Sequence, residues 1–223
     1  DCLCNAAAVY TKNQVKAAPV LLTREHLADG KAQAVIINSG NANACAPFGM
    51  EHARRQGLAA ARALQVDEEN VVVASTGIIG QVLPVEAIEA HAAEMEMKYD
   101  NSLAAAEAIM TTDTKIKMFA VEFEAGGTLC HMGGICKGSG MIHPNMGTML
   151  CFITTDCAIS ANMMKKALLF YVDKTFNRVT VDGDTSTNDM CVVLANGMAG
   201  NSQIEWKDDD FAIFAKALRQ VCE

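Results

Sequence analysis

The 223-residue sequence has few aromatic residues, no concentrated basic segment and no long apolar run. Aromatic residues make up 5% of the chain, whereas 51% is hydrophobic and mostly aliphatic, which is typical of α/β proteins with closely packed layers. The formal net charge of −8 argues against a nucleic-acid partner. No run approaches the roughly 18 apolar residues of a membrane span, and no secretion signal opens the chain. We therefore expect a soluble protein without a membrane partner.

Motifs for metals and cofactors are also lacking. The nine cysteines form no CxxC pair, are odd in number and lie partly in apolar runs, which favours buried free thiols in a reducing cytoplasm. The five histidines show no HExxH or other ligand spacing, and no Gly-Lys-Ser/Thr sequence indicates a P-loop. The sequence therefore predicts no metal site and no bound cofactor.

Short apolar runs bounded by turn residues alternate with amphipathic stretches, which is the pattern of an α/β protein. Ser160 and the three aspartates from Asp208 stand where two helices would begin, since hydroxyl and acidic side chains favour helix N-termini. The predicted strands are 34–38, 71–75 and 149–154, the predicted hairpin joins 117–124 to 128–136, and the predicted helices are 51–65, 84–98, 101–110 and those that follow Ser160 and Asp208. We expect strands layered between helices.

A glycine-interrupted loop runs into a predicted strand at Thr148, in the segment KGSGMIHPNMGTMLCFITT. If the Thr148 hydroxyl attacks the Gly147 carbonyl, the peptide becomes an ester, and hydrolysis then frees a new N-terminus at Thr148. The freed α-amine, with a reference pKa of about 7.7–8.0, acts as base for its own hydroxyl. Lys137 offers a cation to a developing oxyanion or a substrate carboxylate. An ordinary glycine loop that ends in a strand shares these features, so the residues alone leave both readings open.

Four further polar segments attract attention. STGIIG, which begins at Ser75, follows a predicted strand and has the glycine turn of an oxyanion hole, although a plain strand-to-helix turn reads the same way. NSGNANA, from Asn38, and TTDT, from Thr111, fit structural turns as well as substrate binding. The acidic and hydroxyl-rich segment ending in TSTND lacks the glycine of a calcium loop, so we interpret it as a hydrogen-bonded turn that supports a site.

Six motifs in order carry a resemblance to a known family: VKAAPV, NSGNANAC, ASTGIIG, IMTTDT, KGSGMIHPNMGTML and TFNRVTVDGDTSTND. The chain resembles the bifunctional ornithine acetyltransferases, also called glutamate N-acetyltransferases, of arginine biosynthesis. The resemblance implies a layered α/β fold of the ornithine acetyltransferase and self-processing aminopeptidase type. It also implies a ping-pong transfer of acetyl from N-acetyl-ornithine to glutamate, with acetyl-CoA as a further acetyl donor in some members.

The resemblance assigns roles to particular residues. It implies cleavage between Gly147 and Thr148, which would divide the sequence into an alpha-chain portion, 1–147, and the beginning of a beta chain, 148–223. Thr148 would be the nucleophile, and Thr76 and Gly77 the oxyanion-hole pair. Thr111, Lys137 and Thr148 would contact substrate. The two chains would remain together, as a heterotetramer.

The sequence departs from the family pattern in three respects. Gly147 stands where the family usually has alanine, and Ala46-Pro47 replaces the usual Thr-Gly. Family members are nearly twice as long, so we expect a chain truncated at both ends that lacks later substrate-site residues. Two alternatives therefore stay open: a self-processing amidohydrolase or aminopeptidase with an N-terminal nucleophile, and an inactive truncated homologue.

Overall fold

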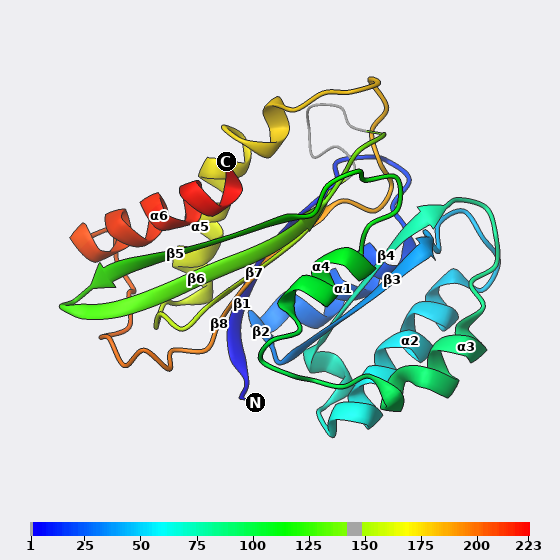
Figure 1. Ribbon diagram of the computed structural model, residues 1–223, viewed down its shortest axis with the longest axis horizontal. Helices are drawn as coiled ribbons and strands as arrows, with labels where there is room; N and C mark the ends of the chain where they lie inside the picture. The colour runs from blue at the N-terminus through cyan, green and yellow to red at the C-terminus, as the bar shows by residue number, and fades with distance from the viewer. Residues whose placement is uncertain (1, 142–148) are drawn as a thin grey trace.

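The computed structural model describes residues 2–141 and 149–223, which form a mixed α/β fold with two sheets (Figure 1). The strands are β1 (Cys4–Tyr10), β2 (Lys31–Ala32), β3 (Ala34–Asn41), β4 (Val71–Ile78), β5 (Lys117–Ala125), β6 (Thr128–Lys137), β7 (Leu150–Thr155) and β8 (Met190–Ala195). The helices are α1 (Ala18–His26), α2 (Gly49–Leu64), α3 (Val85–His91), α4 (Ser102–Ala108), α5 (Ala161–Val172) and α6 (Asp209–Cys222), joined in places by short 3₁₀ turns. The predicted α/β class is confirmed.

The larger sheet combines strands from both ends of the chain. Its order is β2-β1-β8-β7-β6-β5. β7 and β8 run parallel, because the connection between them contains α5, and all other neighbours in this sheet are antiparallel. The smaller sheet pairs β3 with β4 in parallel, with α2 in the crossover. The two sheets are separate ladders, so their relative position depends on packing and side-chain contacts.

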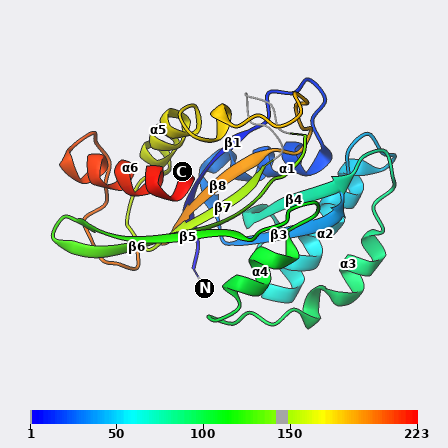
Figure 2. The same ribbon diagram turned by 45° about the horizontal axis from the view of Figure 1, so that its top comes forward.

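The elements form layers (Figures 1 and 2). α5 and α6 cover one face of the large sheet, and β3, β4 and their helices lie on its other face. Side chains of the central strands alternate between these layers: Cys151 and Ile153 of β7 join the cluster with α5 and α6, whereas Leu150 and Phe152 join the cluster that faces β3 and β4. Because both faces are buried, these strands are apolar throughout.

Both predicted helix starts after residue 155 are confirmed. Ser160 is the N-cap of α5, where its Oγ accepts a hydrogen bond from the Met163 N–H at 3.4 Å. Asp208 is the N-cap of α6, where its Oδ1 accepts from the Phe211 N–H at 2.8 Å. Each cap satisfies a backbone donor that the first helical turn leaves unpaired.

One predicted helix is too long, and four helices and strands were not predicted. The helix expected over 84–98 ends after a 3₁₀ turn at Glu94, and Met95 is extended at φ −72°, ψ 119°. The residues from Met95 to Tyr99 are exposed, so no packing partner stabilises further helical turns there. The sequence analysis assigned no structure to β1, α1, β2 or β8. Within the described ranges, no helix has both the length and the hydrophobicity needed to cross a membrane.

Candidate functional site

A buried lysine joins two of the predicted site residues. Lys137 is the last residue of β6 and is 2% exposed. Its Nζ donates to Thr76 Oγ1 at 3.0 Å and to Thr111 Oγ1 at 2.9 Å. The three residues lie on β6, at the end of β4 and in the segment after α4. The structure therefore brings together three of the residues that the resemblance implied.

Burial affects the protonation of this lysine. Removal from water lowers the pKa of Lys137, while the nearby Asp113 carboxylate opposes the change. Burial also acts to raise the pKa of Asp113, but hydrogen bonds from Lys117 and from the Gly138 N–H, at 2.9 Å, outweigh it and leave this pKa below its ordinary value. Asp113 Oδ2 is buried and has no hydrogen-bond partner among residues 2–141 and 149–223. Thus the site contains a poorly solvated cation beside a buried acid.

The Thr76-Gly77 pair occupies the end of β4, where it approaches β3 closely. Gly77 pairs with Gly40 and has a φ of +130°, a backbone conformation that residues other than glycine rarely adopt. A Cβ atom at Gly77 would lie 2.2 Å from the Gly40 carbonyl carbon. Thr76 is buried, whereas Gly77 is exposed. The close contact between strands therefore explains the glycine without reference to catalysis.

The asparagine-rich segment after β3 forms a network with the backbone. Asn41 Oδ1 accepts from the Asn43 N–H at 2.8 Å, and Asn43 Nδ2 donates to the Gly49 carbonyl at 2.9 Å. Ser39 Oγ donates to the Met110 carbonyl at 2.9 Å, which fixes the residue before Thr111. Of the two roles left open for this segment, these contacts support the structural one.

The TSTND segment is a buried, hydrogen-bonded connection, as predicted. Asn188 Nδ2 donates to the Ala42 carbonyl at 2.7 Å and to the Ser75 carbonyl at 2.8 Å. Asp189 Oδ1 accepts from the Met149 N–H at 2.8 Å. The sequence analysis gave this segment a supporting role but assigned no role to Asn188 or Asp189 individually, because their partners here are backbone groups.

Asp189 has an unusual protonation equilibrium. Burial raises its pKa to about 8, against the lowering effects of the Met149 N–H, the Ser186 hydroxyl and the Lys137 cation. Its Oδ2 atom is buried and has no hydrogen-bond partner in the described residues. At neutral pH the carboxyl is therefore mostly protonated.

The predicted nucleophile and cleavage position, Thr148 and Gly147, lie outside the described residues. The described residues continue from Met149, and Leu150 pairs with Lys137 across β7 and β6. Met149 is buried and is covalently the next residue after Thr148. Consequently the described end of β7 lies in the same region as Lys137 and Asp189.

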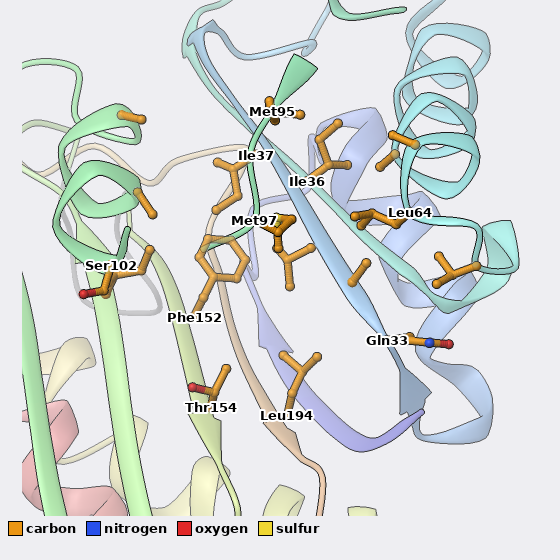
Figure 3. Close-up of a pocket in the computed structure, with 18 of the residues that line it drawn as sticks. Gln33, Ile36, Ile37, Leu64, Met95, Met97, Ser102, Phe152, Thr154 and Leu194 are labelled. Atoms are coloured by element: carbon orange, nitrogen blue, oxygen red, sulfur yellow. The ribbon is translucent and has the colours of Figure 1, made fainter. Parts of the chain in front are cut away.

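A large apolar groove of 1420 Å³ lies elsewhere, between β3 and the large sheet. Figure 3 shows Ile37, Met97, Phe152 and Leu194 among the side chains that line it. Its lining does not include Lys137, Thr76, Gly77 or Thr111. The groove is therefore distinct from the polar candidate site.

Potential metal ligands do not gather in the described ranges, where no three His, Cys, Asp or Glu side chains form a coordinating group. All nine cysteines are free thiols. Burial raises the pKa of Cys157 and Cys222, the latter to about 12, which makes both poor nucleophiles at neutral pH. The polar chemistry of this site rests on hydroxyl, lysine and carboxyl groups.

The fold and the site define a layered α/β protein whose two sheets are joined by buried polar side chains. The chain belongs to the ArgJ family, whose pattern matches residues 1–223, and this confirms the resemblance inferred from the motifs. A curated relative, the arginine biosynthesis bifunctional protein ArgJ of Listeria monocytogenes serovar 1/2a, is 51% identical over 221 residues, which cover 98% of this chain and 56% of the relative. The chain thus spans about half the length of the curated relatives it matches.

Two solved structures agree with this assignment. The arginine biosynthesis bifunctional protein argJ from Bacillus halodurans is 38% identical with a TM-score of 0.62, covering 67% of this chain and 78% of that chain. The ornithine acetyltransferase from Mycobacterium tuberculosis, solved in complex with ornithine, is 35% identical with a TM-score of 0.53, covering 65% of this chain and 76% of that chain. The similarity therefore extends from sequence to fold.

Proposed function

We propose that this chain is part of an acetyltransferase that moves an acetyl group from N-acetyl-ornithine to glutamate, with Thr148 as the nucleophile. The observation that carries the proposal is the buried Lys137, which binds both Thr76 and Thr111. Membership in the ArgJ family and the structural similarity to an ornithine acetyltransferase bound to ornithine support the substrate class.

The reaction has two halves. The Thr148 hydroxyl attacks the acetyl carbonyl, its proton passes to the α-amine, and ornithine leaves with that proton as the acetyl ester forms. The amine of glutamate then attacks the ester, and the Thr148 hydroxyl is regenerated. Thr76 and Gly77 stabilise the negative oxygen of each tetrahedral intermediate. Lys137 orients the Thr76 hydroxyl, and Lys137 and Thr111 contact the substrate.

The α-amine becomes available through cleavage of the chain between Gly147 and Thr148. The two solved family chains align with about two thirds of this chain, whereas the curated sequence aligns with 98%. Such a difference is expected if the solved chains end where a precursor is cut. Portions 1–147 and 148–223 then belong to separate polypeptides of one fold.

The remaining features of the proposal follow the family. The enzyme works in the cytoplasm as a heterotetramer of alpha and beta chains and needs no metal or bound cofactor. Acetyl-CoA serves as a second acetyl donor. The part of the relatives that this chain does not match supplies further residues of the substrate site.

The first experiment replaces the nucleophile in the full-length protein. Thr148→Ala should lower the rate of acetyl transfer by at least about 10³-fold and leave the chain uncut, because both steps need the same hydroxyl. Acetyl transfer to glutamate and intact mass are the measurements, and the wild-type protein should give fragments that meet at Gly147/Thr148.

Thr154→Ala is the matched control, since Thr154 is an exposed threonine on the same strand, β7. It should be cut and should retain activity within a few-fold. Wild-type activity in Thr148→Ala would refute the mechanism. Release of free acetate from N-acetyl-ornithine without transfer to glutamate would instead identify an amidohydrolase.

A further inference from the structure

Two consecutive buried residues link the end of β4 to the beginning of β7. Asn188 and Asp189 precede β8 and are 4% and 0% exposed. Asn188 reaches the smaller sheet, and Asp189 reaches the beginning of β7 in the larger sheet. No β-ladder joins these sheets in the described residues. Apolar packing and side-chain contacts, together with the one-residue link between β2 and β3, therefore set the distance between them.

Asn188 fixes the carboxyl ends of β3 and β4. Its Nδ2 uses both hydrogens, one to the Ala42 carbonyl at 2.7 Å and one to the Ser75 carbonyl at 2.8 Å. Its Oδ1 accepts from Thr187 Oγ1 at 2.6 Å, which orients the amide. Ser75 is covalently joined to Thr76, so Asn188 holds the peptide that leads into the Thr76-Gly77 turn.

Asp189 fixes the amino end of β7. Its Oδ1 accepts from the Met149 N–H at 2.8 Å, and its own carbonyl accepts from the Thr11 N–H at 2.9 Å. The nitrogen of Met149 belongs to the peptide bond that follows Thr148. A side chain and a backbone anchor thus hold Asp189 between β1 and the residue next to the nucleophile.

We propose that Asn188 and Asp189 are positioning residues that hold the Thr76-Gly77 turn in register with the start of β7. This inference rests on the proposed function, because it assigns the pair a role in that acetyl transfer. Neither residue touches the reacting atoms. A misplacement of about 1 Å between reacting groups costs about 10²-fold in rate, so rigid hydrogen bonds across the sheet interface directly affect turnover.

The test compares variants of the full-length protein by kcat, KM and thermal midpoint, with kcat referred to the cleaved fraction measured by mass spectrometry. Asn188→Ala and Asp189→Ala should each lower kcat about 10²-fold with KM changed by no more than a few-fold. Asp189→Asn keeps an oxygen acceptor for the Met149 N–H and should recover most of kcat. Variants that remain uncut also support the proposal, since cleavage uses the same geometry.

Asn201→Ala is the matched control for a purely structural role. Asn201 is also buried, and its amide joins backbone groups of Ala158 and Ser202 away from the site. It should lower the thermal midpoint about as much as Asn188→Ala and leave kcat within a few-fold. If Asn188→Ala does not fold, Thr187→Val removes only the hydrogen bond that orients the amide and should lower kcat about 10-fold.

Two results would overturn the inference. One is a loss of kcat in the Asn188 or Thr187 variant no greater than that of Asn201→Ala at a similar thermal midpoint. The other is an Asp189→Asn enzyme as slow as Asp189→Ala. If Thr148→Ala abolishes transfer while these variants behave like the control, the proposed function stands and only the positioning role fails.

Discussion

Lys137 and Asp189 are buried ionisable residues, and burial favours the neutral form of both. It lowers the pKa of the lysine and raises that of the carboxyl to about 8. Each also favours the charged form of the other through their mutual attraction. Small changes in the surroundings of one residue therefore change the protonation of the other.

The raised pKa of Asp189 predicts a pH-dependent stability. In the unfolded chain this carboxyl has a pKa near 3.8, so the folded state binds its proton more tightly between about pH 4 and 8. The free energy of unfolding should therefore fall as pH rises through this range, by up to about 1.4 kcal/mol per pH unit. Asp189→Asn should remove this contribution.

Urea unfolding of both proteins at several pH values from 5 to 9 provides the measurement. The difference between the two free energies removes the titration of groups that do not interact with Asp189, and it retains the mutual effect of Asp189 and Lys137. It should change steadily up to about pH 8 and then level off. A difference that is constant across the range would contradict the assigned pKa.

β3 and β4 approach each other closely at the end of β4, and this limits which residues can occupy position 77. Gly77→Ala would place a methyl group against the Gly40 backbone, at a φ that already disfavours alanine. We expect a loss of roughly 2–4 kcal/mol in the free energy of unfolding. Gly80 also has a positive φ, +83°, but a Cβ there meets no atom within 4 Å, so Gly80→Ala should cost only about 1 kcal/mol.

Denaturant titration of the two glycine variants measures this difference. Equal losses would show that backbone conformation alone, without the contact to Gly40, sets the preference for glycine at this turn. The comparison separates steric crowding between strands from the intrinsic cost of a positive φ.

Local sequence pattern predicted the elements whose signals are local. The hairpin of β5 and β6 and the capped helices α5 and α6 follow from alternation, turn residues and N-caps. The helix over 84–98 was predicted too long, because its end depends on where packing stops. β1 and β8 pair with each other from opposite ends of the chain, a relation that no window of sequence contains.

The prediction of the site was limited in the same way, because contacts between residues far apart in the sequence have no local signal. Lys137 is 61 positions from Thr76 and 26 from Thr111, so residue spacing could not place them together, and only family resemblance did. Asn188 and Asp189 escaped prediction individually because their partners are mostly backbone groups. A carbonyl or N–H group leaves no residue-specific signature in the sequence.

The two portions of the proposed cleaved protein interlock throughout the large sheet. β7 pairs with β6, and β8 pairs with β1, so strands from 148–223 lie between strands from 1–147. Cysteine and aliphatic side chains from both portions share one core cluster. Cleavage at Gly147/Thr148 would break one peptide bond and leave these contacts in place.

The cleaved protein should therefore behave as one particle. Its fragments should elute together in native size-exclusion chromatography and separate only in strong denaturant, whereas uncut Thr148→Ala should give a single chain under both conditions. Separate elution of the fragments in native buffer would contradict the interlocked arrangement.

The pairing of β1 with β8 also matters while the chain is being made. Tyr10 leaves the ribosome before its partner Met190, which follows 180 positions later. At about 5–20 residues per second, the nascent β1 waits roughly 10–40 s before the strand that completes it exists. Until then this apolar, Ala-rich strand lacks the neighbour that it pairs with in the folded sheet, and exposed apolar segments of this kind are prone to association.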